Sequence, residues 1–137
     1  MNKKAIISVS SKQPSGEEEA IEVVTPGEFY KEGNFYYAIY NETELSGMEG
    51  TETTLKISED VMYLKREGTT NTEMEFRPNT ENVNLYNTPY GTLELKTKTK
   101  GLQVEMKDDG GDVMVDYSLS ISGQPSQNTI LNINIKI

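Results

Sequence analysis

The sequence predicts an all-β fold, a single antiparallel up-and-down β-barrel of about 8–10 strands. Apolar residues recur at every second position, as expected of strands with one buried face. Clusters of Gly, Pro, Asn, Asp and Ser interrupt this alternation about every ten residues. Only 34% of the 137 residues are hydrophobic, which suits a sheet whose other face is solvated.

The strands are expected wherever the alternation runs without interruption. In chain order they cover 7–9, 21–24, 29–30, 35–40, 51–57, 61–66, 72–76, 83–87, 92–100, 102–107, 113–121 and 130–137. The turns between them are expected at 13–19, 25–27, 32–34, 46–50, 58–60, 67–71, 77–82, 108–112 and 122–128. Within the turn expected at 108–112, Gly110 and Gly111 supply the positive φ that a hairpin needs. Connections this short pair each strand with its sequence neighbour, and closing such a meander into a barrel removes its two exposed edges. We therefore expect one domain spanning residues 1–137.

Strand alternation also assigns side chains to the two faces of the sheet. Lys96, Lys98 and Lys100 share one face of their strand, which we interpret as a solvated outer face. In the strand 35–40, Tyr36 and Tyr40 fall on one face and Tyr37 on the other, so one tyrosine set must point inwards and needs polar partners there. The pattern alone leaves open which set it is.

Two segments carry a resemblance to a known family. "LKISEDVMYLKREG" (55–68), which ends in Arg66 and Gly68, and "PYGTLELKTKTKGLQVEMKDDGGDVMVDYSLSISG" (89–123) resemble the YwiB-like family of small bacterial proteins. The resemblance implies a lipocalin-like, or calycin-type, antiparallel barrel in a bacterial cytoplasm. It implies no activity, because none is assigned to the family.

The composition argues against several classes of partner and chemistry. A formal net charge of −9 disfavours nucleic acid and anionic membrane surfaces. The chain has no cysteine and no histidine, so it lacks disulfides, thiolate nucleophiles, histidine general bases and the usual zinc ligands. We therefore expect no metal, no cofactor and no enzymatic activity, and a cytoplasmic location.

Carboxylates cluster mainly in the predicted turns. The pairs Glu42 with Glu44, Glu59 with Asp60 and Asp108 with Asp109 are interpreted as solvated turn acids, because a general acid needs a desolvated site to raise its pKa. The "DDGGD" segment lacks the ligand spacing of an EF-hand loop and is interpreted as a hairpin turn. Thr88 to Gly91 fits a type I turn.

The most plausible function from the sequence is a binding module that accepts a small amphipathic molecule in the barrel interior or at its mouth. Arg66 shares strand parity with Met62 and Leu64, so an inward guanidinium must pair with a carboxylate or bind an anion. The candidate ligand-binding residues are Arg66, Tyr37, Tyr63, Tyr86, Tyr90 and Tyr117. The alternative is an interaction module that presents acidic loops or an exposed sheet face to a basic protein partner. The sequence does not fix an oligomeric state.

Overall fold

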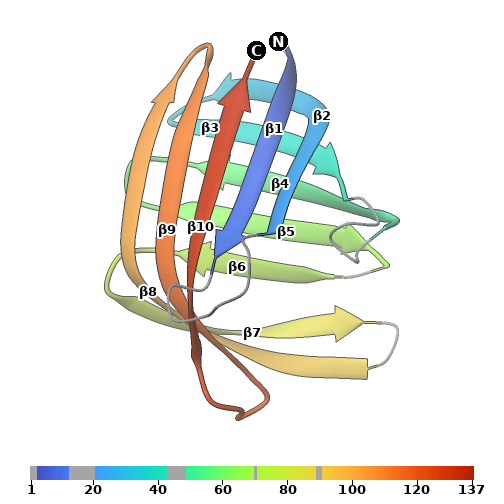
Figure 1. Ribbon diagram of the computed structural model, residues 1–137, viewed down its shortest axis with the longest axis vertical. Coiled ribbons are helices and arrows are strands. Elements are labelled where there is room, and N and C mark those ends of the chain that lie inside the picture. The colour runs from blue at the N-terminus through green and yellow to red at the C-terminus, as the bar shows by residue number, and fades with distance from the viewer. Residues whose placement is uncertain (1–2, 13–20, 43–48, 70, 89–90) are drawn as a thin grey trace.

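The computed structural model is an all-β, ten-stranded antiparallel barrel that is nearly closed (Figure 1). It describes residues 3–12, 21–42, 49–69, 71–88 and 91–137. The strands are β1 (Lys3–Lys12), β2 (Ile21–Glu32), β3 (Phe35–Asn41), β4 (Thr51–Ile57), β5 (Met62–Gly68), β6 (Thr72–Phe76), β7 (Thr80–Thr88), β8 (Gly91–Lys107), β9 (Gly110–Ile121) and β10 (Gln127–Lys136).

The strand order confirms the predicted up-and-down meander. Consecutive strands pair with each other everywhere except at the step from β6 to β7, and β1 also pairs with β10, so β6 and β7 are the two edges of one continuous sheet. The seam between β6 and β7 is bridged at Asn71 and Asn87, which exchange two backbone hydrogen bonds of 2.9 and 2.8 Å. The side-chain amide of Asn82 donates a further hydrogen bond to the carbonyl oxygen of Glu75 across the same seam.

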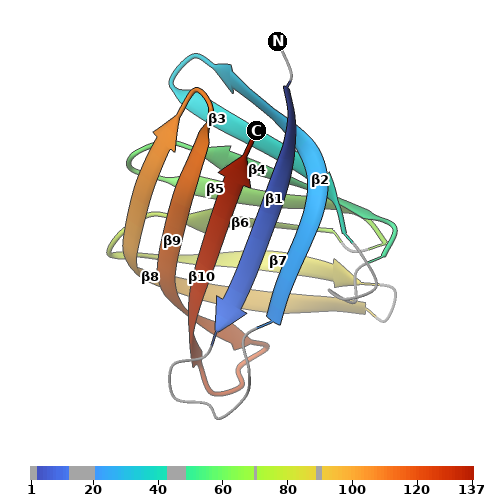
Figure 2. The same cartoon turned by 45° about the horizontal axis from the view of Figure 1, so that its top comes forward.

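Two long strands form the corners of the barrel, and both were predicted as interrupted. In Figures 1 and 2, β1, β9 and β10 run across the strands β3 to β6, while β2 and β8 bend from one direction into the other. The turn predicted at 25–27 is wrong, because β2 continues through Pro26 and passes from pairing with β1 to pairing with β3. Gly27 is required at this corner because a Cβ there would collide with the carbonyl oxygen of Ile39 and the side chain of Ile7.

The second corner is a β-bulge in β8. The register with β9 shifts between Thr99 and Gly101, so one extra residue enters β8. Before the bulge the odd-numbered positions Leu95, Thr97 and Thr99 are buried, whereas after it the even-numbered positions from Leu102 onward face the core. The segments 92–100 and 102–107 are therefore one strand rather than two, and Lys96, Lys98 and Lys100 are exposed as predicted.

The predicted "DDGGD" hairpin is present, although the turn itself is Asp108 and Asp109. Gly110 and Gly111 are the first residues of β9 and both have a positive φ, as expected. A Cβ at Gly110 would collide with the carbonyl oxygen of Ile135 on β10. Glycine is thus required there by the backbone conformation and by the close approach of the neighbouring strand.

We expect Gly110→Ala to lower the free energy of unfolding by about 2 kcal/mol or more, because it adds both backbone strain and a backbone clash. The matched control is Gly101→Ala, since Gly101 lies in the bulge without a positive φ and a Cβ added there would meet no heavy atom within 4 Å. That control should change stability by less than about 0.5 kcal/mol. Urea denaturation followed by tyrosine fluorescence gives both values, and equal midpoints for the two variants would contradict this account.

Candidate functional site: the barrel interior and its mouth

The structure determines which tyrosine set of β3 points inwards. Tyr36, Ala38 and Tyr40 face the interior and pack against the core, whereas Phe35 and Tyr37 lie half-buried on the outer face. The inward Tyr36 stacks on Phe29 of β2, with ring centroids 5.7 Å apart. Tyrosine is therefore divided between the two faces of the same strand.

A polar row crosses four strands on the inner face. Tyr40, Thr53, Arg66 and Thr72 are direct cross-strand partners on β3, β4, β5 and β6, and we call them the Arg66 row. Arg66 faces the interior, on the same face as Met62 and Leu64, and its Nε lies 3.8 Å from Oε1 of Glu42. The same carboxylate oxygen accepts a 2.5 Å hydrogen bond from the hydroxyl of Thr53.

The interpretation of Glu42 as a solvated turn acid is wrong. Its side chain is only 4% exposed, because Glu42 continues the inward parity of Tyr40 beyond the end of β3. That parity was visible in the sequence, where Glu42 lies two residues after Tyr40. Glu44, its proposed pair, lies outside the described residues. Glu59 and Asp60, by contrast, are exposed in the turn between β4 and β5, as expected.

A second polar row lies on the opposite wall. Thr99, Tyr117 and Thr129 are direct cross-strand partners on β8, β9 and β10, and we call them the Tyr117 row. The ring of Tyr117 packs at a tilt on Phe76 of β6, with centroids 4.9 Å apart, so the two walls meet.

The pKa shifts of two interior tyrosines agree with the position of Arg66 between the two walls. Burial, followed by the charge of Glu42, raises the pKa of Tyr40, and the charge of Arg66 opposes this shift. Burial also raises the pKa of Tyr117, again opposed by Arg66. The guanidinium therefore lies close enough to act on tyrosines of both walls, and both tyrosines remain protonated at neutral pH.

Beyond the Arg66 row, the inward rows on β3 to β6 are mainly apolar. They lie on the side of the turns that join β2 to β3 and β4 to β5. The next inward row on β3 to β6 is Ala38, Leu55, Leu64 and Met74, and the one after it is Tyr36, Ile57, Met62 and Phe76. Leu55 and Val115, on opposite walls, have an exposed fraction of 0%. Because no water-sized void adjoins such side chains, the middle of the barrel is filled by the chain itself.

Four buried polar atoms in this packed interior make no hydrogen bond to another group in the described part of the chain. They are Nε of Arg66 and the hydroxyl oxygens of Thr72, Thr97 and Thr99. At 3.8 Å, Arg66 and Glu42 form an ion pair that is too long for a hydrogen bond. Each unsatisfied buried group costs about 1–3 kcal/mol, so the polar half of the interior is retained at the expense of stability.

One end of the barrel carries a hollow. A hollow of about 650 Å³ lies between the turns that join β2 to β3 and β4 to β5 and the facing part of β8, and we call it the mouth. In Figures 1 and 2 these two turns lie beside the upper part of β8. The floor of the mouth is Tyr36, Val104 and Met106, which are half-buried members of the core. Its rim carries the carboxylates of Glu59, Asp60 and Glu105 and one cation, Lys31, whose Nζ lies 5.3 Å from the ring of Tyr36.

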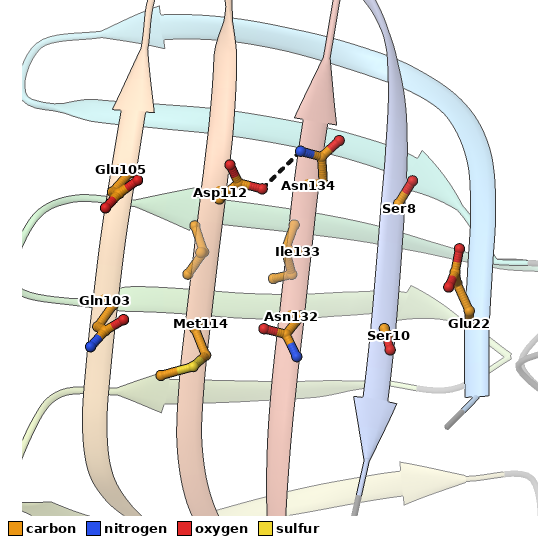
Figure 3. Close-up of a pocket in the computed structure, with 11 residues that line it drawn as sticks. Ser8, Ser10, Glu22, Gln103, Glu105, Asp112, Met114, Asn132, Ile133 and Asn134 are labelled. Atoms are coloured by element: carbon orange, nitrogen blue, oxygen red, sulfur yellow. Dashed lines mark hydrogen bonds between the residues drawn. The ribbon is translucent and has the colours of Figure 1, made fainter. Parts of the chain in front are cut away.

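A second hollow, of about 550 Å³, lies on the outer face of β1, β2, β8, β9 and β10, and we call it the outer groove. Figure 3 shows its polar side chains projecting from adjacent strands. The groove is lined by Ser8, Ser10, Glu22, Gln103, Glu105, Asp112, Val113, Met114, Asn132, Ile133 and Asn134. These include three carboxylates and no lysine or arginine, and Asn134 donates a 2.8 Å hydrogen bond to Asp112 (Figure 3).

The six candidate ligand-binding residues do not form one site. Arg66 and Tyr117 lie in the interior, on facing walls. Tyr37 and Tyr63 lie on the outer face, where they line a smaller hollow. The side chain of Tyr86 and all of Tyr90 lie outside the described residues, and so do the two central residues, 89 and 90, of the turn predicted at 88–91. The sequence did not predict the floor of the mouth, because the alternating pattern of 102–107 marks Val104 and Met106 only as core positions.

The described residues contain neither of two further kinds of site. No group of three or more acidic side chains there is arranged to hold a metal ion. Within the same residues, no helix is long and apolar enough to cross a membrane.

Comparison with known proteins identifies the family. A family model described as "Domain of unknown function (DUF1934)" matches residues 6–133. The chain belongs to the DUF1934 family. It is 27% identical over 113 residues to the uncharacterized β-barrel protein YwiB of Bacillus subtilis (strain 168), a match that covers 82% of this chain and 78% of that protein.

A solved structure shows the same fold. The crystal structure of the ywiB protein from Bacillus subtilis matches with a TM-score of 0.87 and 25% identity, over 98% of this chain and 92% of that one. The predicted membership of the YwiB-like family is thus confirmed, and so is the antiparallel barrel. Neither relative's description names a ligand, so a function for this DUF1934 barrel has to be argued from its own side chains.

We expect Thr97→Val to stabilise the barrel by about 0.5–2 kcal/mol, because it replaces a buried, unpartnered hydroxyl with a methyl group of the same shape. Thr53→Val is the matched control: it removes the hydroxyl that donates to Glu42 and should destabilise by about 1–3 kcal/mol. Chemical denaturation measures both changes. Loss of stability in Thr97→Val as large as that in Thr53→Val would show that the Thr97 hydroxyl has a partner in solution.

Proposed function

We propose that this barrel is a non-catalytic binding protein that holds a small amphipathic molecule at its mouth. The observation that carries the proposal is the hollow of about 650 Å³ whose floor is made of core side chains and whose rim is polar. Its volume falls in the range of about 300–1,000 Å³ that small-ligand sites occupy. The filled middle of the barrel favours the mouth over the interior as the place where a ligand binds.

The side chains of the mouth indicate the chemistry of the ligand. Tyr36, Val104 and Met106 offer apolar contact to a hydrocarbon group, and burial of that group supplies most of the affinity. Glu59, Asp60 and Glu105 outnumber Lys31 on the rim, so a cationic or hydrogen-bond-donating head group complements it better than an anionic one. The ligand class is therefore an amphipathic amine or a related neutral donor.

A binding role agrees with the residues available for chemistry. The chain contains no histidine or cysteine, and the rim carboxylates Glu59 and Asp60 are exposed, which is unfavourable for a general acid. We extend the proposal to a protein that works in the cytoplasm without a cofactor.

Isothermal titration with octylamine, octanol and octanoate tests this proposal, because the three probes share one tail and differ in head-group charge. We expect octylamine to bind most tightly and octanoate most weakly. Val104→Ser should weaken all three, whereas Asp60→Asn should weaken octylamine selectively, each by about threefold or more. The control is Val83→Ser, since Val83 is 57% exposed on β7 and lies outside the mouth. Equal affinities for the three probes, or Val104→Ser binding like Val83→Ser, would refute the proposal.

The outer groove favours a second function, docking of a basic protein segment. Its lining contributes carboxylates, amides and hydroxyls, and the whole chain carries a net charge of −9. A lysine-rich extended segment would complement this surface in charge and in hydrogen bonding.

Fluorescence anisotropy of a labelled oligolysine peptide tests the second function. We expect binding at about 20 mM salt that weakens strongly at about 200 mM, as screening requires. Glu22→Gln, in the groove, should weaken it by about twofold or more, whereas Glu52→Gln, an exposed position on β4, should not. An equal loss of peptide affinity in Glu22→Gln and Glu52→Gln would mean that the peptide responds only to the net charge of the protein and does not bind in the groove.

A further inference from the structure

A row of aromatic and cationic side chains crosses the outer face of the barrel from β2 to β5. Tyr30, Tyr37, Lys56 and Tyr63 are consecutive cross-strand partners, and we call them the Lys56 row. Tyr30 and Tyr37 stack with centroids 4.8 Å apart and an interplanar angle of 7°. Nζ of Lys56 lies 6.0 Å from the ring centroid of Tyr37, 5.7 Å from that of Tyr63 and 4.3 Å from that of Phe35.

The fold does not require aromatic residues at outward positions. The outer face of the opposite wall has a comparable row, Glu105, Asp112, Asn134 and Ser8, and every member of it is polar. An antiparallel sheet with one solvated face normally carries polar residues there. Tyrosine on an outer face is instead characteristic of binding surfaces, because its ring supplies large contact area at low entropic cost.

A hollow of about 240 Å³ adjoins the Lys56 row. It is lined by Tyr37, Thr54, Lys56, Tyr63, Lys65 and Glu73. Thr54 is the next outward residue on β4 after Lys56, and it is a short side chain between the longer Ile39 of β3 and Lys65 of β5. The hollow thus lies over Thr54, with Tyr37 and Tyr63 on either side.

The hollow is lined by two cations, Lys56 and Lys65, and by one carboxylate, Glu73. Lys65 is already paired with Glu67 at 2.9 Å. Nζ of Lys56 lies near three aromatic rings, and among the described residues no carboxylate lies within ion-pair distance of it. Contact with ring faces stabilises the ammonium but supplies no strong hydrogen-bond acceptor, so the N–H donors of this half-buried side chain are left to solvent. An anionic group beside Lys56 would replace that solvent with a charged acceptor.

We propose that this outer hollow binds a planar aromatic anion, with its ring between Tyr37 and Tyr63 and its carboxylate or phosphate group on Nζ of Lys56. The ring faces provide offset stacking, and the ammonium provides a charge-assisted hydrogen bond. The site lies on the outside of β3 to β6 and adjoins the mouth at Phe35, whose ring contacts Lys56 and also lines the mouth. The two sites differ in the charge of the ligand that they favour, so differently charged probes distinguish them.

Amide chemical-shift titration of the labelled protein with 2-naphthoate tests this proposal. We expect the largest shifts at the outward residues of β3 to β6 around Thr54. Decahydro-2-naphthoate, which keeps the charge but not the planar ring, and 2-naphthamide, which keeps the ring but not the charge, should each bind about fivefold or more weakly. Comparing the affinity of 2-naphthyl phosphate with that of 2-naphthoate shows whether the site prefers a phosphate or a carboxylate group.

Matched variants separate the site from the general surface. Lys56→Gln and Tyr63→Leu should each weaken 2-naphthoate binding by about fivefold or more. Lys98→Gln, on the exposed face of β8, and Tyr30→Leu, in the row but outside the hollow, should bind within about twofold of the parent protein. Shifts centred on the mouth or the outer groove would overturn the proposal. So would equal affinities for 2-naphthoate, decahydro-2-naphthoate and 2-naphthamide, or an unchanged affinity in Tyr63→Leu. None of these outcomes bears on octylamine binding at the mouth.

Discussion

The structure depends on one constraint, the strict alternation of side chains between the two faces of a ladder that closes almost completely around itself. Once β1 pairs with β10 and the seam at Asn71 and Asn87 is bridged, every strand has a fixed inner and outer face. A shift of the strand register by one residue would turn Arg66 and Tyr36 to the outer face and bring Lys65 and Tyr37 into the interior. The bulge before Gly101 follows the same constraint. One extra residue switches the inward positions of β8 from odd to even, and the apolar residues after the bulge still face the core.

Alternation across many strands turns short sequence patterns into layers. In "TETTLKI" the inward residues are two threonines followed by Leu55 and Ile57, and the same change from polar to apolar occurs on β5 and β6 at the same level. The interior is therefore polar in one half, where Glu42 and Arg66 pair, and apolar in the other. Because side chains fill the middle, this polarity is not by itself a binding site. We propose the mouth as the binding site because there the apolar half meets solvent, at Tyr36, Val104 and Met106.

The sequence predicted the fold more fully than the site, for physical reasons. Period-two patterns and turn residues are local, so the strands and the outward lysines of β8 could be read directly. Proline and glycine occur both in turns and at the corners of continuous strands. The sequence around Pro26, Gly27 and Gly101 therefore fits either structure, and only the register of the neighbouring strands distinguishes a corner from a turn. The face of each tyrosine on β3 is likewise set by pairing with β2 and β4, which no local pattern contains. Glu42 shares its parity with Tyr40, but because the sequence did not show which face of β3 points inwards, it did not show that Glu42 is buried either.

The measurement that tests the central claim most directly is native mass spectrometry of the gently purified protein, compared with the same sample after denaturation. A small amphipathic molecule held at the mouth predicts a reproducible extra mass in the native spectrum that disappears on denaturation. It also predicts that Val104→Ser, expressed and purified in parallel, carries less of that mass. A native spectrum showing only the bare chain, unchanged after incubation with a bacterial small-molecule extract, would contradict the claim that the barrel is a small-molecule binding protein.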